Sequence, residues 1–399
     1  MTENWQRWAI AGVLLSGCQE PAHPGQPPIP AAPAPAPVAS FPAPATVAAS
    51  PATVAASPAP TAASAPGPDP ATPTPAPVAP VADGSQAASV RPPLGEGQRA
   101  ALLAGAEERI VSKREHFTVS NEYRHDLWFP YLRGLGGAYV GVASDQNYTL
   151  MAVARSEVGY LLDLDRQVVR LHRAYMALIA ASPDPDAFLA RFDERAGRAT
   201  AALLEAGLSD MSVRDRTAAI EFVADNRAAL RAYLTAVKAT RRGERGVTWL
   251  ADPELYAYIR GMVAGGRLRP LNGNLAGETA MATIAASAAQ LGLAVKLLYL
   301  SNAEEYLFYT PEFAANVRAL PGAPDSVVLR TIHDRFSGWE SCGDGDRRWN
   351  YQVQPLADFQ ARLADRKNTA RTAMLERATQ AGAIDRVARG VSVFKRAEG

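Results

Sequence analysis

The sequence contains almost no cysteine, with only Cys18 and Cys342 among 399 residues. Cys18 lies in a segment typical of an export signal, which leaves Cys342 without a partner. The composition therefore excludes an internal disulfide and a cysteine-based metal site. The stability of the folded part must come from its packed core.

An excess of either charge is also missing. Lysine and arginine number 41 and aspartate and glutamate 40, so the formal net charge is +1. Surfaces that bind nucleic acid normally show a basic excess, and we expect no such partner. The hydrolase motifs G-x-S-x-G and H-E-x-x-H do not occur. Residues 344–346, DGD, lack the bidentate glutamate of a calcium loop, and we expect no metal.

Long hydrophobic runs are absent, and the N-terminal run WAIAGVLLS (8–16) is short. A membrane-spanning helix needs about 20 apolar residues, whereas this run has the length of a signal-peptide core. The run leads into Leu15-Ser16-Gly17-Cys18. That site resembles the lipobox of bacterial lipoproteins, whose cysteine becomes the new N-terminus and carries the lipid. The resemblance implies a signal peptide at 1–18, lipidation of Cys18, and a membrane-anchored place in the cell envelope, periplasmic or surface-facing.

Aromatic and charged residues are scarce between residues 19 and 93, where Pro, Ala, Ser, Thr and Val predominate. The heptad PATVAAS occurs twice in tandem, at 44–50 and 51–57. Such a segment cannot bury enough apolar surface to offset its ordering entropy. Its proline content favours an extended conformation of about 3.1 Å per residue. We expect a disordered spacer.

The remaining chain, 94–399, alternates apolar runs with helical patterns. Strands are expected at 138–143, 158–164, 267–271, 294–300, 326–331 and 349–354. Helices are expected at 98–115, 148–157, 166–181, 253–263, 278–291, 309–320 and from 356 to 380 and beyond, with a helical insertion at about 183–245. Strands joined by helix-length crossovers predict an α/β fold, a doubly wound, mostly parallel sheet covered on both faces.

Polar residues follow the expected strands where each one ends. They are Ser144, Asp145, Gln146, Asn147 and Tyr148; Asp163 and Asp165; Asn272 and Asn274; and Ser301, Asn302, Glu304, Glu305 and Tyr306. Ligands of open parallel sheets bind beyond the carboxyl ends of the strands. These residues are therefore candidates for a crevice that binds a small polar ligand. The alternative is that they only form turns and helix caps.

A phosphate-binding glycine turn is missing. Gly134, Gly136 and Gly137 precede the first expected strand and Gly141 lies within it, whereas a dinucleotide fingerprint places glycines after the strand. Asp163 follows Gly141 by about twenty residues, where an acidic side chain can bind ribose hydroxyls. Capping of the helix that begins at Arg166 is an equally good explanation.

Several segments carry a resemblance to a known family. They are FPYLRGLGGAYVGVASDQNYTLMAVARSE (129–157), LLDLDRQVVRLHR (161–173), LYLSNAEEYLFY (298–309), SVVLRTIH (326–333) and WNYQVQPLADFQ (349–360). The chain resembles a family of bacterial proteins and lipoproteins of unestablished activity, with a fold like class I S-adenosylmethionine-dependent methyltransferases. The resemblance implies a methyltransferase-like domain and makes S-adenosylmethionine a possible cofactor. Two functions stay open, a catalytically silent binding module and a methyltransferase or related transferase.

Overall fold

The computed structural model describes residues 92–108, 110, 117–336, 338–343, 346 and 348–395. The expected signal peptide, the lipidated Cys18 and nearly all of the expected spacer lie outside these residues. They stay predictions.

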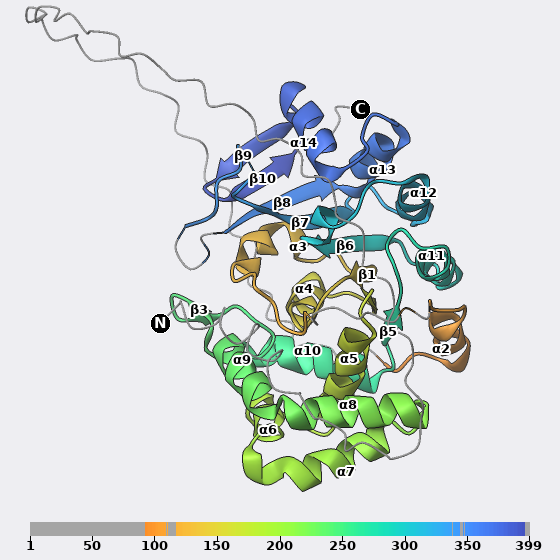
Figure 1. Cartoon of the computed structure of the whole chain (residues 1–399), viewed down its shortest axis with the longest axis vertical. Coiled ribbons are helices and arrows are strands. Elements are labelled where there is room, and N and C mark those ends of the chain that lie inside the picture. The colour runs from red at the N-terminus through yellow and green to blue at the C-terminus, as the bar shows by residue number, and fades with distance from the viewer. Residues whose placement is uncertain are drawn as a thin grey trace, which may run out of the picture. The chain divides into compact units, whose positions relative to one another are not determined.

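One eight-stranded sheet forms the centre of the domain (Figure 1). Its strands are β1 (Ala138–Gly141), β2 (Val158–Asp163), β5 (Leu268–Asn272), β6 (Val295–Ser301), β7 (Val327–His333), β8 (Trp349–Pro355), β9 (Ile384–Ala388) and β10 (Val391–Phe394). Their order is β5-β2-β1-β6-β7-β8-β10-β9. The first five are mutually parallel, β8 is antiparallel to β7, β10 is parallel to β8, and β9 is antiparallel to β10. The expected α/β fold with a mostly parallel sheet is confirmed.

Helices cover both faces of this sheet. The helices of the crossovers and of the C-terminal part are α4 (Gln146–Ala154), α5 (Arg166–Ala180), α10 (Pro253–Ala264), α11 (Ala280–Gln290), α12 (Pro311–Ala319), α13 (Leu356–Ala364) and α14 (Arg371–Gln380). Alternate residues of β1 enter two separate cores: Tyr139 packs with α4, α5 and α10, and Val140 with α11, α12 and α13. The reversal of crossover direction places the switch point of the sheet between β1 and β6.

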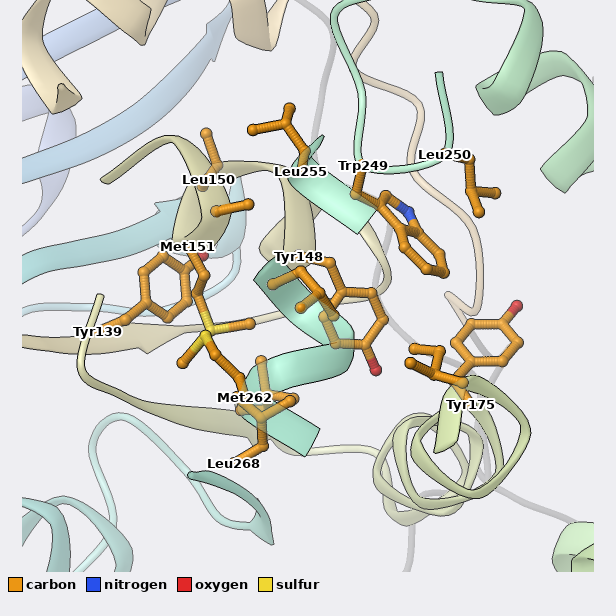
Figure 2. Close-up of a cluster of buried hydrophobic side chains, with 14 of the residues drawn as sticks. Tyr139, Tyr148, Leu150, Met151, Tyr175, Trp249, Leu250, Leu255, Met262 and Leu268 are labelled. Atoms are coloured by element: carbon orange, nitrogen blue, oxygen red, sulfur yellow. The ribbon is translucent and has the colours of Figure 1, made fainter. Parts of the chain in front are cut away.

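The expected helical insertion lies between α5 and α10. It consists of α6 (Pro185–Ala190), α7 (Gly197–Gly207), α8 (Val213–Asp225) and α9 (Arg227–Ala239), followed by the two-residue strands β3 (Arg241–Arg242) and β4 (Arg245–Gly246). The segment after β4 carries Trp249, which packs against Tyr148 of α4 with ring centroids 5.0 Å apart (Figure 2). The insertion and α4 therefore share one core.

The helix expected at 98–115 is shorter than predicted. Helix α2 spans only Glu96–Leu103, and the chain continues without helical structure through Glu108. Gly105 has a φ of +83°, which helical backbone does not allow. The acidic residues that follow bind backbone amides of a loop instead of continuing the helix.

The C-terminal end was also predicted wrongly, because helices were expected beyond residue 380. Instead β9 and β10 form a hairpin, and β10 inserts beside β8. Val391 and Phe394 are buried, whereas β9 is exposed along most of its length. An apolar pattern confined to one four-residue strand is too short to distinguish from a helix by its periodicity.

The glycine-rich segment before β1 is a tight corner. Gly136 and Gly137 have φ values of +65° and +60°, which residues with a side chain rarely adopt. A Cβ at Gly137 would also lie 2.7 Å from the carbonyl oxygen of Ala294. These glycines bring the chain into β1 beside β6, and they lie at the amino end of the strand, opposite to the edge where ligands bind.

Candidate functional site

A buried carboxylate lies at the carboxyl ends of β6 and β7. Glu122, from the segment before the 3₁₀ turn His125–Trp128, is 3% exposed. Its carboxylate accepts hydrogen bonds from the hydroxyls of Tyr299 (2.6 Å), Ser301 (2.5 Å) and Thr331 (2.7 Å), and contacts His125 Nε2 at 3.1 Å. Burial by itself would raise the pKa of Glu122, but His125 and the hydroxyl donors hold it below its usual value. The chain thus places its own carboxylate next to the switch point.

The loop after β1 is bound by neighbouring parts of the chain. Ser144 Oγ donates to the carbonyl of Thr118 (2.7 Å). The carboxylate of Asp145 accepts from the hydroxyl of Tyr233 in α9 (2.6 Å) and from Nε1 of Trp249 (2.9 Å). Asp145 is 1% exposed, and burial raises its pKa. The insertion therefore occupies Asp145, and the segment around Thr118 occupies Ser144, two polar residues that the sequence assigned to a ligand.

Asn147, Gln146 and Tyr148 are turned inward from the start of α4. Asn147 accepts from Tyr139 Oη (2.6 Å) and donates to the carbonyls of Val142 (2.9 Å) and Ser144 (2.6 Å). Gln146 Nε2 donates to Tyr299 Oη at 3.3 Å, while its Oε1 is buried without a hydrogen bond in the described structure. These side chains hold the first loop rather than present it to solvent.

A buried histidine continues this network. His172 Nδ1 lies 2.8 Å from Tyr148 Oη, and its Nε2 lies 2.8 Å from the carbonyl oxygen of Ala143. Burial lowers the pKa of His172 to about 4, so the ring is neutral at pH 7. A neutral ring with a proton on Nε2 satisfies both contacts, because it accepts from Tyr148 and donates to Ala143.

The end of β2 fixes the same loop from the other side. Asp163 accepts from the amides of Ala143 (2.9 Å) and Asp165 (2.8 Å), and burial raises its pKa to about 6. Ala143 has a φ of +67°, so a strained residue is held at this point by Asp163 and His172. Asp165 accepts from the amide of Gln167 at 2.8 Å and caps α5, which is the alternative that the sequence left open.

The end of β5 faces another part of the chain. Asn272 donates to the carbonyls of Asp163 and Leu164, both at 3.0 Å, and accepts from the amide of Ile110 at 2.9 Å. Asn274 accepts from the amide of Ala276 at 3.0 Å and so forms a local turn. Both residues thus contribute to loop geometry.

Glu304 and Glu305 belong to a buried ionic cluster on the opposite face of the sheet. Glu304 pairs with Arg330 of β7 at 2.6 Å, with both side chains fully buried, and accepts a hydrogen bond from Tyr309. Glu305 pairs with Arg371 (3.2 Å) and with the more exposed Arg335 (2.7 Å). These two predicted residues therefore bind arginine side chains of the chain itself.

Asn302 and Tyr306 differ from the other predicted residues. Within the described chain, no hydrogen bond involves either side chain, and Tyr306 is 73% exposed. The neighbouring Phe308 is 76% exposed. The structure thus brings the predicted residues to the carboxyl ends of the strands, where most of them form hydrogen bonds or ion pairs within the chain. The segment after β6 that carries Asn302, Tyr306 and Phe308, here called the rim, stays accessible.

The comparisons with known proteins place the chain in a family. A family described as "Domain of unknown function (DUF7790)" matches residues 117–395. The chain belongs to the DUF7790 family. No curated protein matches it. The DUF7790 domain thus contains the whole sheet and both buried polar networks, while α2 and the residues around Glu108 precede it.

Metal binding and membrane crossing are two further possibilities for the described part of the DUF7790 chain. No group of three or more His, Cys, Asp or Glu side chains there is arranged to hold a metal ion. None of its helices is both long enough and apolar enough to cross a membrane.

Several residues that build the site were missed from the sequence. They are Glu122, His125, Tyr233, Trp249, Tyr299, Thr331 and Arg371. Arg330 and Thr331 lie in a buried strand. A charged side chain such as that of Arg330 is buried only when it has a partner, so the sequence carried a signal for a buried ion pair at this position. Glu122 precedes the first strand in an irregular segment, and no periodicity marks it.

Proposed function

We propose that this chain is a membrane-anchored lipoprotein of the cell envelope whose α/β domain binds a small hydroxylated ligand and does not transfer a methyl group. The anchor is proposed from the sequence around Cys18. The binding role is proposed from the accessible rim of the sheet. The parallel strands run third-second-first-fourth-fifth in chain order, which supports a Rossmann-like, methyltransferase-like domain.

The position of Glu122 is the observation that carries the proposal against methyl transfer. S-adenosylmethionine would need the loop after β1 and the end of β6, but Asp145 and Ser301 already contact Trp249 and Glu122. Asp163 directs both carboxylate oxygens to backbone amides. The residues present therefore do not fit that cofactor.

The rim supports a hydroxylated ligand by its chemistry. Asn302 offers an amide, and Tyr306 and Phe308 offer exposed aromatic faces within a few residues of it. Amide groups exchange hydrogen bonds with hydroxyls, and aromatic faces pack against the apolar side of a sugar-like ring. A few placed polar groups beside apolar surface are typical of small-molecule sites.

Calorimetric titration of the full chain in detergent tests the proposal. We expect no heat of binding with S-adenosylmethionine or S-adenosylhomocysteine at 1 mM, and saturable binding to at least one member of a panel of mono- and disaccharides. The saccharide signal should weaken at least tenfold in Tyr306→Ala and stay unchanged in Val213→Ala, which trims a side chain exposed on the insertion. Micromolar binding of S-adenosylmethionine, lost in Asp163→Asn, would overturn the proposal and favour a methyltransferase.

A further inference from the structure

The N-terminal part of the described chain lies outside the family domain. We call residues 92–110 the strap; the structure describes all of them except residue 109. The family match begins at residue 117. The strap nevertheless covers β5, the edge strand of the sheet, and packs α2 against α11 (Figure 1). The domain therefore binds a segment that lies outside the residues matched by the family.

Two arginines of the domain recognise the main chain of the strap. Arg269 of β5 donates to the carbonyls of Leu102 (2.9 Å), Ala104 (2.5 Å) and Gly105 (3.0 Å), where α2 ends. Arg267 donates to the carbonyl of Pro92 at 2.6 Å. The last carbonyls of a helix have no partners within it, and they carry partial negative charge. Arg269 therefore binds the end of a helix, whatever side chains that helix has.

Backbone amides of the domain recognise the acidic pair that follows. Glu108 accepts from the amides of Asn274 (2.7 Å), Thr279 (3.1 Å) and Ala280 (3.2 Å), at the start of α11. Glu107 accepts from the amide of Asn272 at 3.0 Å. A Cβ at Gly277 would lie 2.1 Å from a carboxylate oxygen of Glu108, so the glycine makes room for it.

Side chains of α11 complete the contact. Ser287 Oγ donates to the carbonyl of Ala101 (2.8 Å), and Thr283 Oγ1 donates to the carbonyl of Ala106 (2.9 Å). The apolar part is small, because among the described strap residues only Ala101 and Leu102 are buried, with Leu94 partly buried against the core. Most of the binding is thus made of hydrogen bonds and charge, and water can replace these groups when the strap leaves. Regions with few buried apolar contacts open at low free energy.

We propose that β5 and α11 form a peptide-docking surface, and that the strap is its resident ligand, bound in cis and released as a unit. The surface selects a short helix followed by two acidic residues, through Arg267, Arg269 and the amides of residues 272–280. Release exposes both guanidinium groups and the free edge of β5. The inference stands without the proposed ligand at the rim, because it uses other residues.

Hydrogen exchange of the unmodified full chain is the first test. We expect the amides of Asn274, Thr279 and Ala280 to exchange through local opening, at least a hundredfold faster than those of β1 and β6. Exchange of all these amides at the one rate of global unfolding would overturn the proposal, because the strap would then be an integral part of the fold.

A labelled synthetic peptide of residues 92–110 is the second test, by fluorescence anisotropy against full-length chains. Wild type and Glu96→Gln, whose altered side chain is exposed on α2, should bind it weakly because their straps occupy the surface. The double variant Glu107→Gln, Glu108→Gln should bind it at least tenfold more tightly, and a peptide with both substitutions should not bind. Equal affinity for all three chains would contradict the proposal, and the exchange experiment decides if the double variant does not fold.

Discussion

Glu122 and Asp163, two carboxylates at the carboxyl ends of the parallel strands, have pKa values shifted in opposite directions. Glu122 is surrounded by hydroxyl donors and His125, so its pKa lies below the usual 4.5. Asp163 accepts hydrogen bonds from two backbone amides, which lower its pKa, but the effect of burial is larger and raises the pKa to about 6. Because a pKa difference between folded and unfolded states makes stability depend on pH, the two residues contribute in different directions and in different pH ranges.

We predict that Glu122→Gln lowers the free energy of unfolding by about 2 kcal/mol at pH 7, because charged hydrogen bonds are lost in a buried place. A carboxyl group with a lower pKa in the folded state than in the unfolded state stabilises the fold at pH values above its unfolded pKa. This stabilisation is lost as the pH falls through the folded pKa. Wild type should therefore lose stability as the pH falls below about 4.5, and the variant should lose less. Urea unfolding from pH 3 to 7 measures this, with Glu96→Gln as the exposed control; parallel curves for all three would disprove it.

Asp163 should act in the opposite sense between its unfolded and folded pKa values. From 3.8 to about 6 the folded state holds the proton longer, so stability falls as pH rises. The full effect is on the order of 3 kcal/mol or less, at about 1.4 kcal/mol per pKa unit. Asp163→Asn should remove this decline between pH 4 and 6. Retention of the decline in the variant, measured by urea unfolding, would assign it to another group.

At the scale of elements, the helical insertion is joined to the sheet through Asp145. Tyr233 of α9 and Trp249 donate to the two oxygens of this buried carboxylate. Trp249 also stacks on Tyr256 of α10 at 5.9 Å between centroids. The insertion is thus fastened to the loop after β1 by hydrogen bonds as well as by its apolar core.

We predict that Trp249→Phe destabilises the chain by about 1–3 kcal/mol, because one oxygen of Asp145 loses its donor while most of the ring volume is kept. Val213→Ala, on the exposed face of α8, should change stability by less than about 0.5 kcal/mol. Urea midpoints measure both. A loss in Trp249→Phe no larger than in the control would show that the hydrogen bond contributes little.

The predictable part of the fold follows from apolar runs with clear ends. Ala138–Gly141, Val158–Asp163 and Val295–Ser301 are buried strands bounded by polar residues, and their positions were foreseen within two residues. The hairpin of β9 and β10 was not, because its exposed strand contains Asp385 and Arg386 and lacks an apolar face.

The candidate site was predictable in location but not in accessibility. The local sequence around Asp145, at the end of a strand, is the same whether its carboxylate binds a ligand or Trp249. The difference depends on a partner 104 residues away. No local pattern carries that information, since the contact is created by the packing of the insertion.

At the scale of the whole molecule, the proposed anchor makes one strong prediction. Cys18→Ser should move the protein from the membrane fraction to the soluble fraction of the expressing bacterium, and should abolish incorporation of labelled palmitate. Each acyl chain expected on Cys18 would contribute about 0.8 kcal/mol per buried CH₂. A single chain gives only marginal membrane binding, whereas several chains together would hold the protein stably. Membrane association that persists in Cys18→Ser would disprove lipidation as the anchor.

The two edge strands of the sheet are protected against pairing with another chain in different ways. One edge, β5, contains Pro270, which has no amide hydrogen to donate, and lies beneath the strap. The other, β9, has a nearly fully exposed strand with Asp385 and Arg386 in it. Charged edge strands resist pairing with a second chain. The proposed lipid anchor would confine copies to a two-dimensional surface, where they meet far more often than in free volume, and this charged border would keep neighbouring copies from pairing edge to edge into a continuous sheet.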